Sequence, residues 1–326
     1  MSELDRKINA ILKLVGEAKE PIGSAEIASI LKEQGIDMPE RTVRYHLKEL
    51  SEKGLMKGLW KEGRVITSKG MDEIGNALVF DKMGFMSSRI DNLAYQMDFN
   101  LEEKSGRVIL NFSLIHKSDF LKALKIMKMV FRSRLATGEK VLVFEAGQRI
   151  GNIEVPAGRV GFGTLCSINL NGVFLKHSIP IESKMGGLLQ IENERPLRFT
   201  EIINYDGSTL DPHEIFIKSR MTSVLGATEG AGKILAGLRE IPAASVHEAE
   251  ALIRKIEAAG IGRVLMLGKP GQTMLGMPVG VERAGLVVPG GLNPVAACEE
   301  RGIETESKAL SALVDYGQLV SFESLL

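Results

Sequence analysis

An internal duplication in the last two thirds of the chain places the strongest constraint on the fold. The segment that starts VLVFEAGQRIGN at Val141 aligns with the segment that starts VLMLGKPGQTML at Val264. Past a one-residue gap, the pairs keep one spacing: Gly147/Gly271, Gln148/Gln272, Val155/Val279, Arg159/Arg283, Gly161/Gly285 and Asn169/Asn293. The ESK triplets at 182–184 and 306–308 continue it. We therefore expect two copies of one unit, residues 104–200 and 230–326, related by a pseudo-twofold axis.

Each copy alternates strand and helix patterns. In the first copy, GRVILNFSLI predicts a strand, KSDFLKALKIMKMV a helix and KVLVF a second strand, and the second copy repeats this order. A glycine-rich region with short strands follows in both copies. This alternation predicts an α/β module.

The two copies are expected to differ after their glycines. SINLNGVFLKH, residues 167–177, carries an Asn-Gly pair between alternating residues, which predicts a β-hairpin. LNPVAACEERG, residues 292–302, predicts a helix instead. In that helix Asn293 is the cap, Pro294 takes the first position and Gly302 marks the end.

The first 75 residues have the pattern of a winged helix-turn-helix. An apolar stripe from Leu4 to Val15 predicts one helix, and Ser24 is expected to cap a second that ends at Gly35. A third helix runs from Pro39 to Gly54, and two short strands joined by KEG follow. In this fold the third helix enters the major groove of DNA and the hairpin, or wing, contacts the backbone.

The third helix separates an apolar face from a polar one. Val43, Leu47 and Leu50 recur at intervals that bury one face. His46 lies only about 60° from Val43 around the helix and is expected to be partly packed. The residues suited to bases and phosphates are Arg41, Thr42, Arg44, Tyr45 and Lys48 on the helix and Lys61 and Arg64 on the wing. Two alternatives remain: a solvated polar helix face, or a winged helix used for protein contacts.

Composition limits the classes of partner. Lysine plus arginine and aspartate plus glutamate both total 41, so the net charge is zero and a general nucleic-acid coat is excluded. Residues 39–69 nevertheless hold eight basic and four acidic residues, which favours one local nucleic-acid-facing module. No apolar run approaches the ~18 residues of a membrane span. The two cysteines lack CxxC spacing, so we expect no zinc site and a cytoplasmic location.

Three motifs together resemble the archaeal nitrogen-regulatory repressor family NrpR. They are ERTVRYHLKELSEKGL near the N-terminus, GTLCSINLNGVFLKHSIP with GGLL in the first copy, and PGGLNPVAACEERGI in the second. The resemblance covers essentially the full length. It implies a dimeric transcriptional repressor that binds palindromic operators of nitrogen-assimilation genes and is released from double-stranded DNA by 2-oxoglutarate. Some family members carry two sensor modules in tandem, whereas this chain has one.

The resemblance and the patterns together define three segments. Residues 1–75 are expected to form the winged helix, residues 76–103 a helical connector, and residues 104–326 a duplicated domain for effector binding and dimerisation. The predicted fold class is a multidomain α+β and α/β protein.

A 2-oxoglutarate site needs cations or free backbone N–H groups for two carboxylates. The paired arginines and lysines of the two copies meet this need, and glycine turns at 186–187 and 290–291 would present N–H groups to an anion. The candidate effector residues are Arg159, Cys166, Lys176, His177, Lys184, Gly186, Gly187, Arg283, Gly290, Gly291, Asn293, Cys298 and Lys308. The alternatives are structural ion pairs for the arginines and lysines and small buried thiols for the cysteines.

Enzyme motifs are incomplete. GATEGAGKI, residues 226–234, has Ala227 where a phosphate loop needs its first glycine and Ile234 in place of the hydroxyl residue. A Cys166 nucleophile would need His177 as its base, and the five histidines lack metal-ligand spacing. We therefore expect no catalytic residue, metal or cofactor. The alternative function is an α/β small-molecule-binding protein or enzyme whose winged helix serves assembly.

Overall fold

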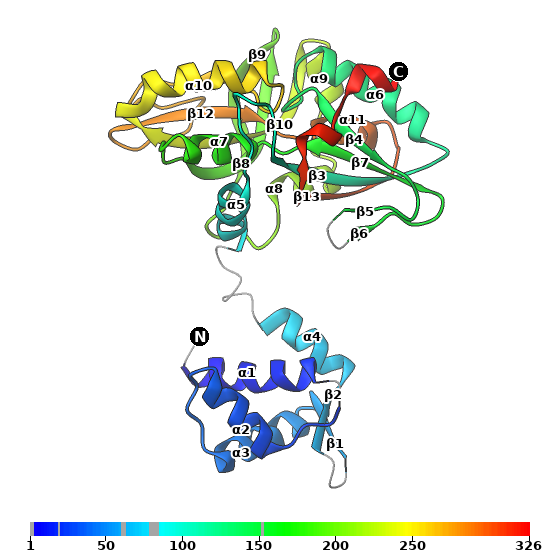
Figure 1. Cartoon of the computed structure of the whole chain (residues 1–326), viewed down its shortest axis with the longest axis vertical. Coiled ribbons are helices and arrows are strands. Elements are labelled where there is room, and N and C mark those ends of the chain that lie inside the picture. Colours follow the sequence, from blue (N-terminus) through cyan, green and yellow to red (C-terminus); the bar gives the residue numbers. More distant parts are fainter. Residues whose placement is uncertain (1–2, 19, 60–62, 78–84, 151–152) are drawn as a thin grey trace. The chain divides into compact units, whose positions relative to one another are not determined.

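The computed structural model describes residues 3–18, 20–59, 63–77, 85–150 and 153–326 (Figure 1). The chain divides into two compact units, residues 1–83 and 84–326. Each unit is described by itself. Among the described residues, no helix combines the length and apolar character needed to cross a bilayer.

The first unit has three helices, a two-stranded antiparallel wing and a fourth helix. These are α1 (Glu3–Glu17), α2 (Ser24–Glu33), α3 (Glu40–Glu52), β1 (Met56–Leu59), β2 (Gly63–Ile66) and α4 (Ser68–Ala77). Ile11, Ile27 and Val43 bring one buried side chain from each of the first three helices to a common core. The predicted winged helix is therefore confirmed.

Two details of the first unit differ from the sequence pattern or add to it. Gly23, not Ser24, is the cap of α2, and the Ser24 hydroxyl donates to a Glu40 carboxylate oxygen at 3.0 Å instead. Ile22 forms a β-bridge with Arg64, which places a third chain segment beside β2 of the wing. Gly63 beside it has φ +124° and would press a Cβ onto the Ile22 backbone, so only glycine fits there.

The second unit contains two five-stranded sheets, and every strand pairing within them is antiparallel. Its first half comprises α5 (Phe85–Gln96), β3 (Arg107–His116), α6 (Phe120–Arg132), β4 (Lys140–Phe144), β5 (Arg149–Ile150), β6 (Ile153–Glu154), β7 (Arg159–Leu165), α7 (Asn169–Lys176), β8 (Glu182–Glu192) and β9 (Arg195–Asn204). Its second half comprises α8 (Pro212–Lys218), α9 (Val224–Thr228), β10 (Ala231–Pro242), α10 (Val246–Ala258), β11 (Met266–Leu267), β12 (Arg283–Pro289), α11 (Asn293–Glu300), β13 (Thr305–Asp315) and β14 (Val320–Ser321).

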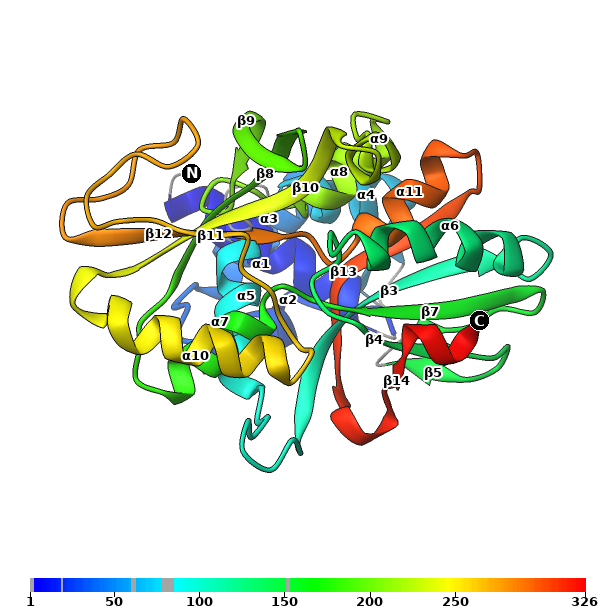
Figure 2. The same cartoon turned by 90° about the horizontal axis from the view of Figure 1, so that it is seen from above.

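The two copies exchange their last helix and strand. The first lobe is the sheet β13-β3-β7-β4-β14, and the second lobe is the sheet β11-β12-β10-β8-β9. Strand β13 of the second copy thus pairs with β3 of the first, and β8 of the first copy pairs with β10 of the second. Helix α11 packs on α6 in the first lobe and α7 contacts α10 in the second, as Figure 2 shows. Neither copy can complete a lobe alone.

Matching hydrogen bonds within the two copies agree with the pseudo-twofold relation. Asn169 accepts from the Ile109 N–H at 2.7 Å and donates to the Ile109 carbonyl at 2.9 Å. Asn293 makes the same two bonds to Leu235, at 2.8 and 3.0 Å. Both asparagines are fully buried, so these bonds tie each exchanged helix to the first strand of its own copy.

The predicted hairpin at residues 167–177 is wrong, because these residues enter α7. Asn171 and Gly172 lie inside this helix rather than at a turn. Only glycine fits at position 172, because a Cβ there would lie 2.4 Å from the Met97 sulfur. The missing side chain lets α5 and the residue after it pack closely on α7. The copies are therefore alike at this point, since α7 corresponds to α11.

The predicted glycine turn at 186–187 is also wrong. Both glycines lie inside β8 and pair with β10 on one side and β9 on the other. A Cβ on Gly186 would meet Pro212 at 2.9 Å, and one on Gly187 would meet the Glu201 carbonyl at 2.5 Å. Close packing over the strand explains these glycines, and their backbone groups belong to the sheet ladders.

Residues 201–229, between the two predicted copies, contain part of β9 and all of α8 and α9. Of the expected helical connector, residues 78–84 lie outside the described part, and α5 forms a helix over Phe85–Gln96. Ala94 and Ile90 are buried in the core of the second unit.

We predict that Asn169→Ala and Asn293→Ala each lower the free energy of unfolding of the second unit. Each change leaves one buried N–H, of Ile109 or Leu235, without a partner, which costs about 1–3 kcal/mol, while the carbonyls keep the Cys166 and Gly290 N–H groups as donors. Urea denaturation followed by circular dichroism measures the loss. Asn204→Ala, at an exposed position of β9, is the matched control and should change stability by less than about 0.5 kcal/mol. Equal effects of all three changes would contradict the role of the two asparagines.

Candidate DNA interface and effector cavity

Helix α3 presents a polar face to solvent. Val43, Leu47 and Leu50 are buried, whereas Arg41 and Tyr45 are exposed, Tyr45 by 64%. Arg41 has no ion pair within the described part of the chain. Arg41 and Tyr45 are therefore the α3 side chains most available to a nucleic acid.

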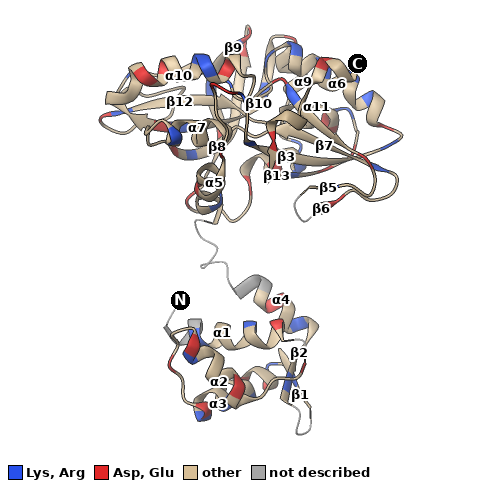
Figure 3. Cartoon of the chain, viewed as in Figure 1, with Lys and Arg blue, Asp and Glu red and all other residues tan. Residues whose placement is uncertain are grey.

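The other cations of α3 are engaged by carboxylates of the same helix. Arg44 donates to Glu40 at 2.5 Å, and Lys48 lies 3.8 Å from Glu52. The hydrogen bond from Arg44 lowers the pKa of Glu40. These pairs are solvent-exposed and therefore weak, so a phosphate can displace the carboxylates. Figure 3 shows acidic residues interspersed with the basic ones in this unit.

The remaining positions of the predicted interface differ in accessibility. Thr42 is half-buried, and His46 is buried at 4% exposed, as its position near Val43 indicated. Arg64 is half-buried, and its side chain lies over Gly58 of the opposite wing strand. The Arg64 Nη1 is 2.9 Å from the position that a Cβ on Gly58 would take. Lys61 lies outside the described residues.

The paired arginines of the two copies form reciprocal ion pairs. Arg159 donates to Glu306 at 3.0 Å, and Arg283 donates to Glu182 at 3.1 Å. Each pair joins a strand of one copy to the exchanged strand of the other. Lys184 contacts Glu182 at 2.7 Å, which raises the pKa of the lysine. This arrangement corresponds to the structural ion pairs that the sequence left open as an alternative.

The structure does not bring Cys166 together with His177. Cys166 precedes helix α7, whereas Lys176 and His177 are exposed at its far end. The His177 Nδ1 lies 2.9 Å from the Val173 carbonyl in the last turn. The proposed thiol–imidazole pair therefore has no geometric basis.

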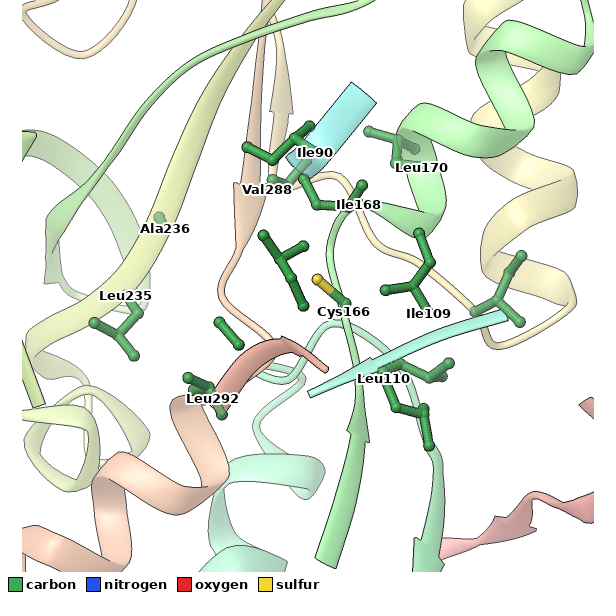
Figure 4. Close-up of a cluster of buried hydrophobic side chains, with 14 of the residues drawn as sticks. Ile90, Ile109, Leu110, Cys166, Ile168, Leu170, Leu235, Ala236, Val288 and Leu292 are labelled. Carbon is green, nitrogen blue, oxygen red and sulfur yellow. The ribbon is translucent and has the colours of Figure 1, made fainter. Parts of the chain in front are cut away.

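The two cysteines lie in different parts of the core. Figure 4 shows the Cys166 sulfur among apolar side chains that include Ile109 and Ile168. Cys298 lies under α6 and donates to the Ala123 carbonyl at 3.7 Å. Burial raises the pKa of Cys166 to about 12 and raises the pKa of Cys298 as well. Both side chains are therefore thiols at neutral pH.

A small cavity joins several polar groups at the boundary between the lobes. Cys166 and Gly291, two predicted effector residues, line it together with side chains that the sequence analysis missed. These are Asn111, Ser167, Tyr205, Asp211 and His213. Gly290 lies at its edge, since a Cβ there would be 3.2 Å from the His213 ring, but its N–H donates to the Leu235 carbonyl. The cavity volume is about 10 Å³, enough for about one water.

A larger pocket of about 500 Å³ lies next to the small cavity. Asp211 and Ala309 line both spaces. The larger pocket also contains two cations, Arg89 and Lys308, and the carboxylate of Glu214. Burial raises the pKa of Glu214, although its bond from the Ala309 N–H opposes this effect.

The wall between the two spaces is a bulge in β13. Three residues of β13, 309–311, stand opposite the single residue Asn111 of β3. The Asn111 side-chain oxygen accepts from the Leu310 N–H at 3.1 Å. Leu310 has φ +51°, a left-handed conformation that is unusual for this residue type. Arg89 donates to the Leu310 carbonyl at 2.7 Å and holds the bulge in place.

The cavity is suited to binding rather than to nucleophilic catalysis. Burial keeps Cys166 protonated and lowers the pKa of His213, so neither a thiolate nor an imidazolium is available at pH 7. No cluster of three or more His, Cys, Asp or Glu side chains could hold a metal within the described ranges. The segment 226–234 runs from the end of α9 into β10, which is not the strand–loop–helix order of a phosphate loop.

We predict that neither cysteine reacts quickly with Ellman's reagent in the native chain at pH 8. Both thiols are buried and protonated, so thiolate is scarce and access is blocked. Both should react at once in guanidinium chloride, which is the internal control. Rapid labelling of one cysteine in the native chain would show that its surroundings open more readily than the packing indicates.

Two known domain families match the chain, one in each unit. The family described as NrpR regulatory domains NRD1 and 2 matches residues 83–321. The ribonuclease R winged-helix domain matches residues 9–74, in agreement with the fold of the first unit.

Two relatives match almost all of the chain. It is 36% identical to the global nitrogen regulator NrpRI of Methanosarcina mazei, over 96% of this chain and 97% of the relative. It is 34% identical to the global nitrogen regulator NrpR of Methanococcus maripaludis, over 95% of this chain and 54% of the relative. The chain thus spans about half the length of the second protein.

A solved structure supports the fold of the second unit. A nitrogen repressor-like protein from Methanococcus jannaschii superposes with a TM-score of 0.62 and 28% identity. The superposition covers 72% of this chain and 97% of that protein.

Proposed function

Because the chain belongs to the NrpR family, we propose that it is a nitrogen-responsive transcriptional repressor that is released from operator DNA by 2-oxoglutarate. The first unit binds the operator, and the second unit binds the effector and forms a homodimer. This proposal joins the relatives' description as global nitrogen regulators to the geometry of the two units.

The exposed polar face of α3 carries the DNA-binding part of the proposal. In a winged helix this face enters the major groove, where arginine pairs with guanine and polar side chains contact phosphates. Arg41 is free to reach a base at once, whereas Arg44 must first leave Glu40. Lys48 and the wing residues Lys61 and Arg64 are assigned to the phosphates.

One winged helix reads only a short sequence. A dimer places two such helices on half-sites related by twofold symmetry, which explains why the expected operator is palindromic. Selection of bound duplexes from a random library by the full-length chain tests this point. The account expects enrichment of a palindrome, and enrichment of a single half-site would contradict the dimer.

We predict that Arg41→Ala weakens binding to the selected operator by about 1–3 kcal/mol, or roughly 5- to 150-fold. Arg44→Ala should cost less, because Arg44 must break its ion pair with Glu40 before it can contact DNA. Fluorescence anisotropy at several salt concentrations measures both effects, and binding should fall steeply with salt. Lys13→Ala, an exposed change on α1, is the matched control. Equal losses for Arg41→Ala and Lys13→Ala would refute base reading by α3.

The effector part of the proposal rests on the two adjoining spaces at the boundary between the lobes. They offer Lys308, Arg89 and buried polar groups to a small dicarboxylate. Since the exchanged strand β13 forms their common wall, an occupant would act on both copies at once.

We predict that 2-oxoglutarate at millimolar concentration dissociates the chain from its operator. Succinate and glutarate, which lack the keto group, serve as controls and should act more weakly. Lys308→Met should raise the 2-oxoglutarate concentration needed for half release, while leaving operator affinity unchanged without effector. Release that is insensitive to Lys308→Met would exclude this lysine from the site.

A further inference from the structure

Arg239 is a buried cation without a countercharge. It lies in β10 and is 1% exposed. Its Nε donates to the Asn171 side-chain oxygen at 2.8 Å, and its Nη2 donates to the Ser167 hydroxyl at 2.9 Å. Its Nη1 has no hydrogen-bond partner among the described residues. A guanidinium keeps its proton in proteins, and an uncompensated buried charge is strongly unfavourable.

No carboxylate among the described residues forms an ion pair with the guanidinium. The two ionisable side chains that act on it most favourably are Tyr205 and Cys166. Burial raises the pKa of both groups, so both are neutral at pH 7. Asp211 of the same cavity caps helix α8 instead, by accepting from the His213 and Glu214 N–H groups.

The fold does not require a cation at this position. When the copies are aligned through Ile109 and Leu235, the counterpart of Arg239 is Ser113. Ser113 is equally buried and is satisfied by a 2.9 Å hydrogen bond to Ser307 of the exchanged strand β13. The same place in the first lobe is therefore filled by a neutral, fully paired group. Only the second lobe retains a buried charge.

The guanidinium reaches the small cavity through Ser167, which lines that cavity and accepts from the Arg239 Nη2. Gly237 is on the same face of β10, and the position of its missing Cβ is 3.3 Å from the Arg239 Nη1. Gly186 pairs with Gly237 across the sheet, and its missing Cβ would be 3.1 Å from the Tyr205 hydroxyl. The two facing glycines thus let the guanidinium and the Tyr205 phenol pack closely over the sheet.

We propose that Arg239, together with Ser167 and Tyr205, forms an anion site that binds one carboxylate group of the effector. The inference rests on the proposed function and adds the residue that neutralises the ligand. A carboxylate accepts charge-assisted hydrogen bonds from a guanidinium and further bonds from hydroxyl groups. It supplies the missing charge at Nη1.

Entry of the carboxylate requires displacement of the β13 bulge. The cavity next to Ser167 and Tyr205 has room for about one water, and the 500 Å³ pocket lies beyond Ala309. Moving residues 309–311 joins the two spaces. Because β13 belongs to the second copy and pairs with β3 of the first, ligand entry shifts the contact between the copies.

Isothermal titration calorimetry of the full chain tests the site with 2-oxoglutarate, glutarate and inorganic phosphate as probes. Arg239→Met should weaken 2-oxoglutarate binding roughly 30-fold or more, because it removes a desolvated charge partner. Its Tm without ligand should be unchanged or higher, since it removes an unpaired buried charge. Ser167→Ala keeps the charge and should weaken binding less.

Arg263→Met is the matched control. Arg263 is also a largely buried arginine, but it has a carboxylate partner, Glu139, at 3.4 Å and does not line the cavity. Its replacement should lower the Tm and leave 2-oxoglutarate affinity within about threefold of the unmodified chain.

The possible outcomes distinguish a wrong assignment of the Arg239 site from a wrong identity of the effector. If Arg239→Met binds 2-oxoglutarate as the unmodified chain does, or if its Tm falls sharply, Arg239 is structural and the site is wrong, although the proposed effector stands. If another probe binds in an Arg239-dependent manner and 2-oxoglutarate does not, the site stands and the effector identity is wrong. If no probe binds, both are wrong.

Discussion

The exchange of a helix and a strand between two copies of one unit is the constraint on which the second unit depends. Strands β8 and β13 each complete the sheet of the other copy, and Asn169 and Asn293 fasten the exchanged segments by the same pair of buried bonds. One core cluster consequently extends through both lobes, and a second lies under α6 in the first lobe. A displacement of either exchanged strand changes both lobes, which is the property that a sensor needs.

The polar cavity occurs where the symmetry of the exchange fails. Asn111 of β3 stands opposite three residues of β13, whereas its counterpart Gly237 pairs with Gly186, next to a smaller bulge at Lys184. Likewise, the neutral Ser113 corresponds to the charged Arg239. A symmetric duplication would have filled both places with the same packing. The left-handed Leu310 lines this cavity, and the incompletely paired guanidinium of Arg239 lies behind Ser167, which lines it as well.

The sequence predicted the winged helix and the duplication because both depend on local periodicity and on matched spacing along the chain. The sequence pattern failed at residues 167–177, where an Asn-Gly pair indicated a turn. These residues enter helix α7 instead, in which Gly172 packs closely against Met97, a contact between segments far apart in the sequence. The cavity residues were largely missed. Arg239 interrupts an apolar strand, KILAGLREI, and this was the available signal, but only the exchange brings it beside Ser167. Arg159 and Arg283 matched in sequence because they form matched ion pairs.

We propose that effector and operator compete through one conformational equilibrium of the whole chain. Binding linkage requires that each ligand weaken the other by the same factor, typically about 5- to 150-fold. The direct test is calorimetry of 2-oxoglutarate with the full chain alone and with the chain saturated by its selected operator. The account predicts a lower 2-oxoglutarate affinity in the presence of DNA, by the factor with which 2-oxoglutarate lowers operator affinity. An unchanged 2-oxoglutarate affinity on the operator would contradict it.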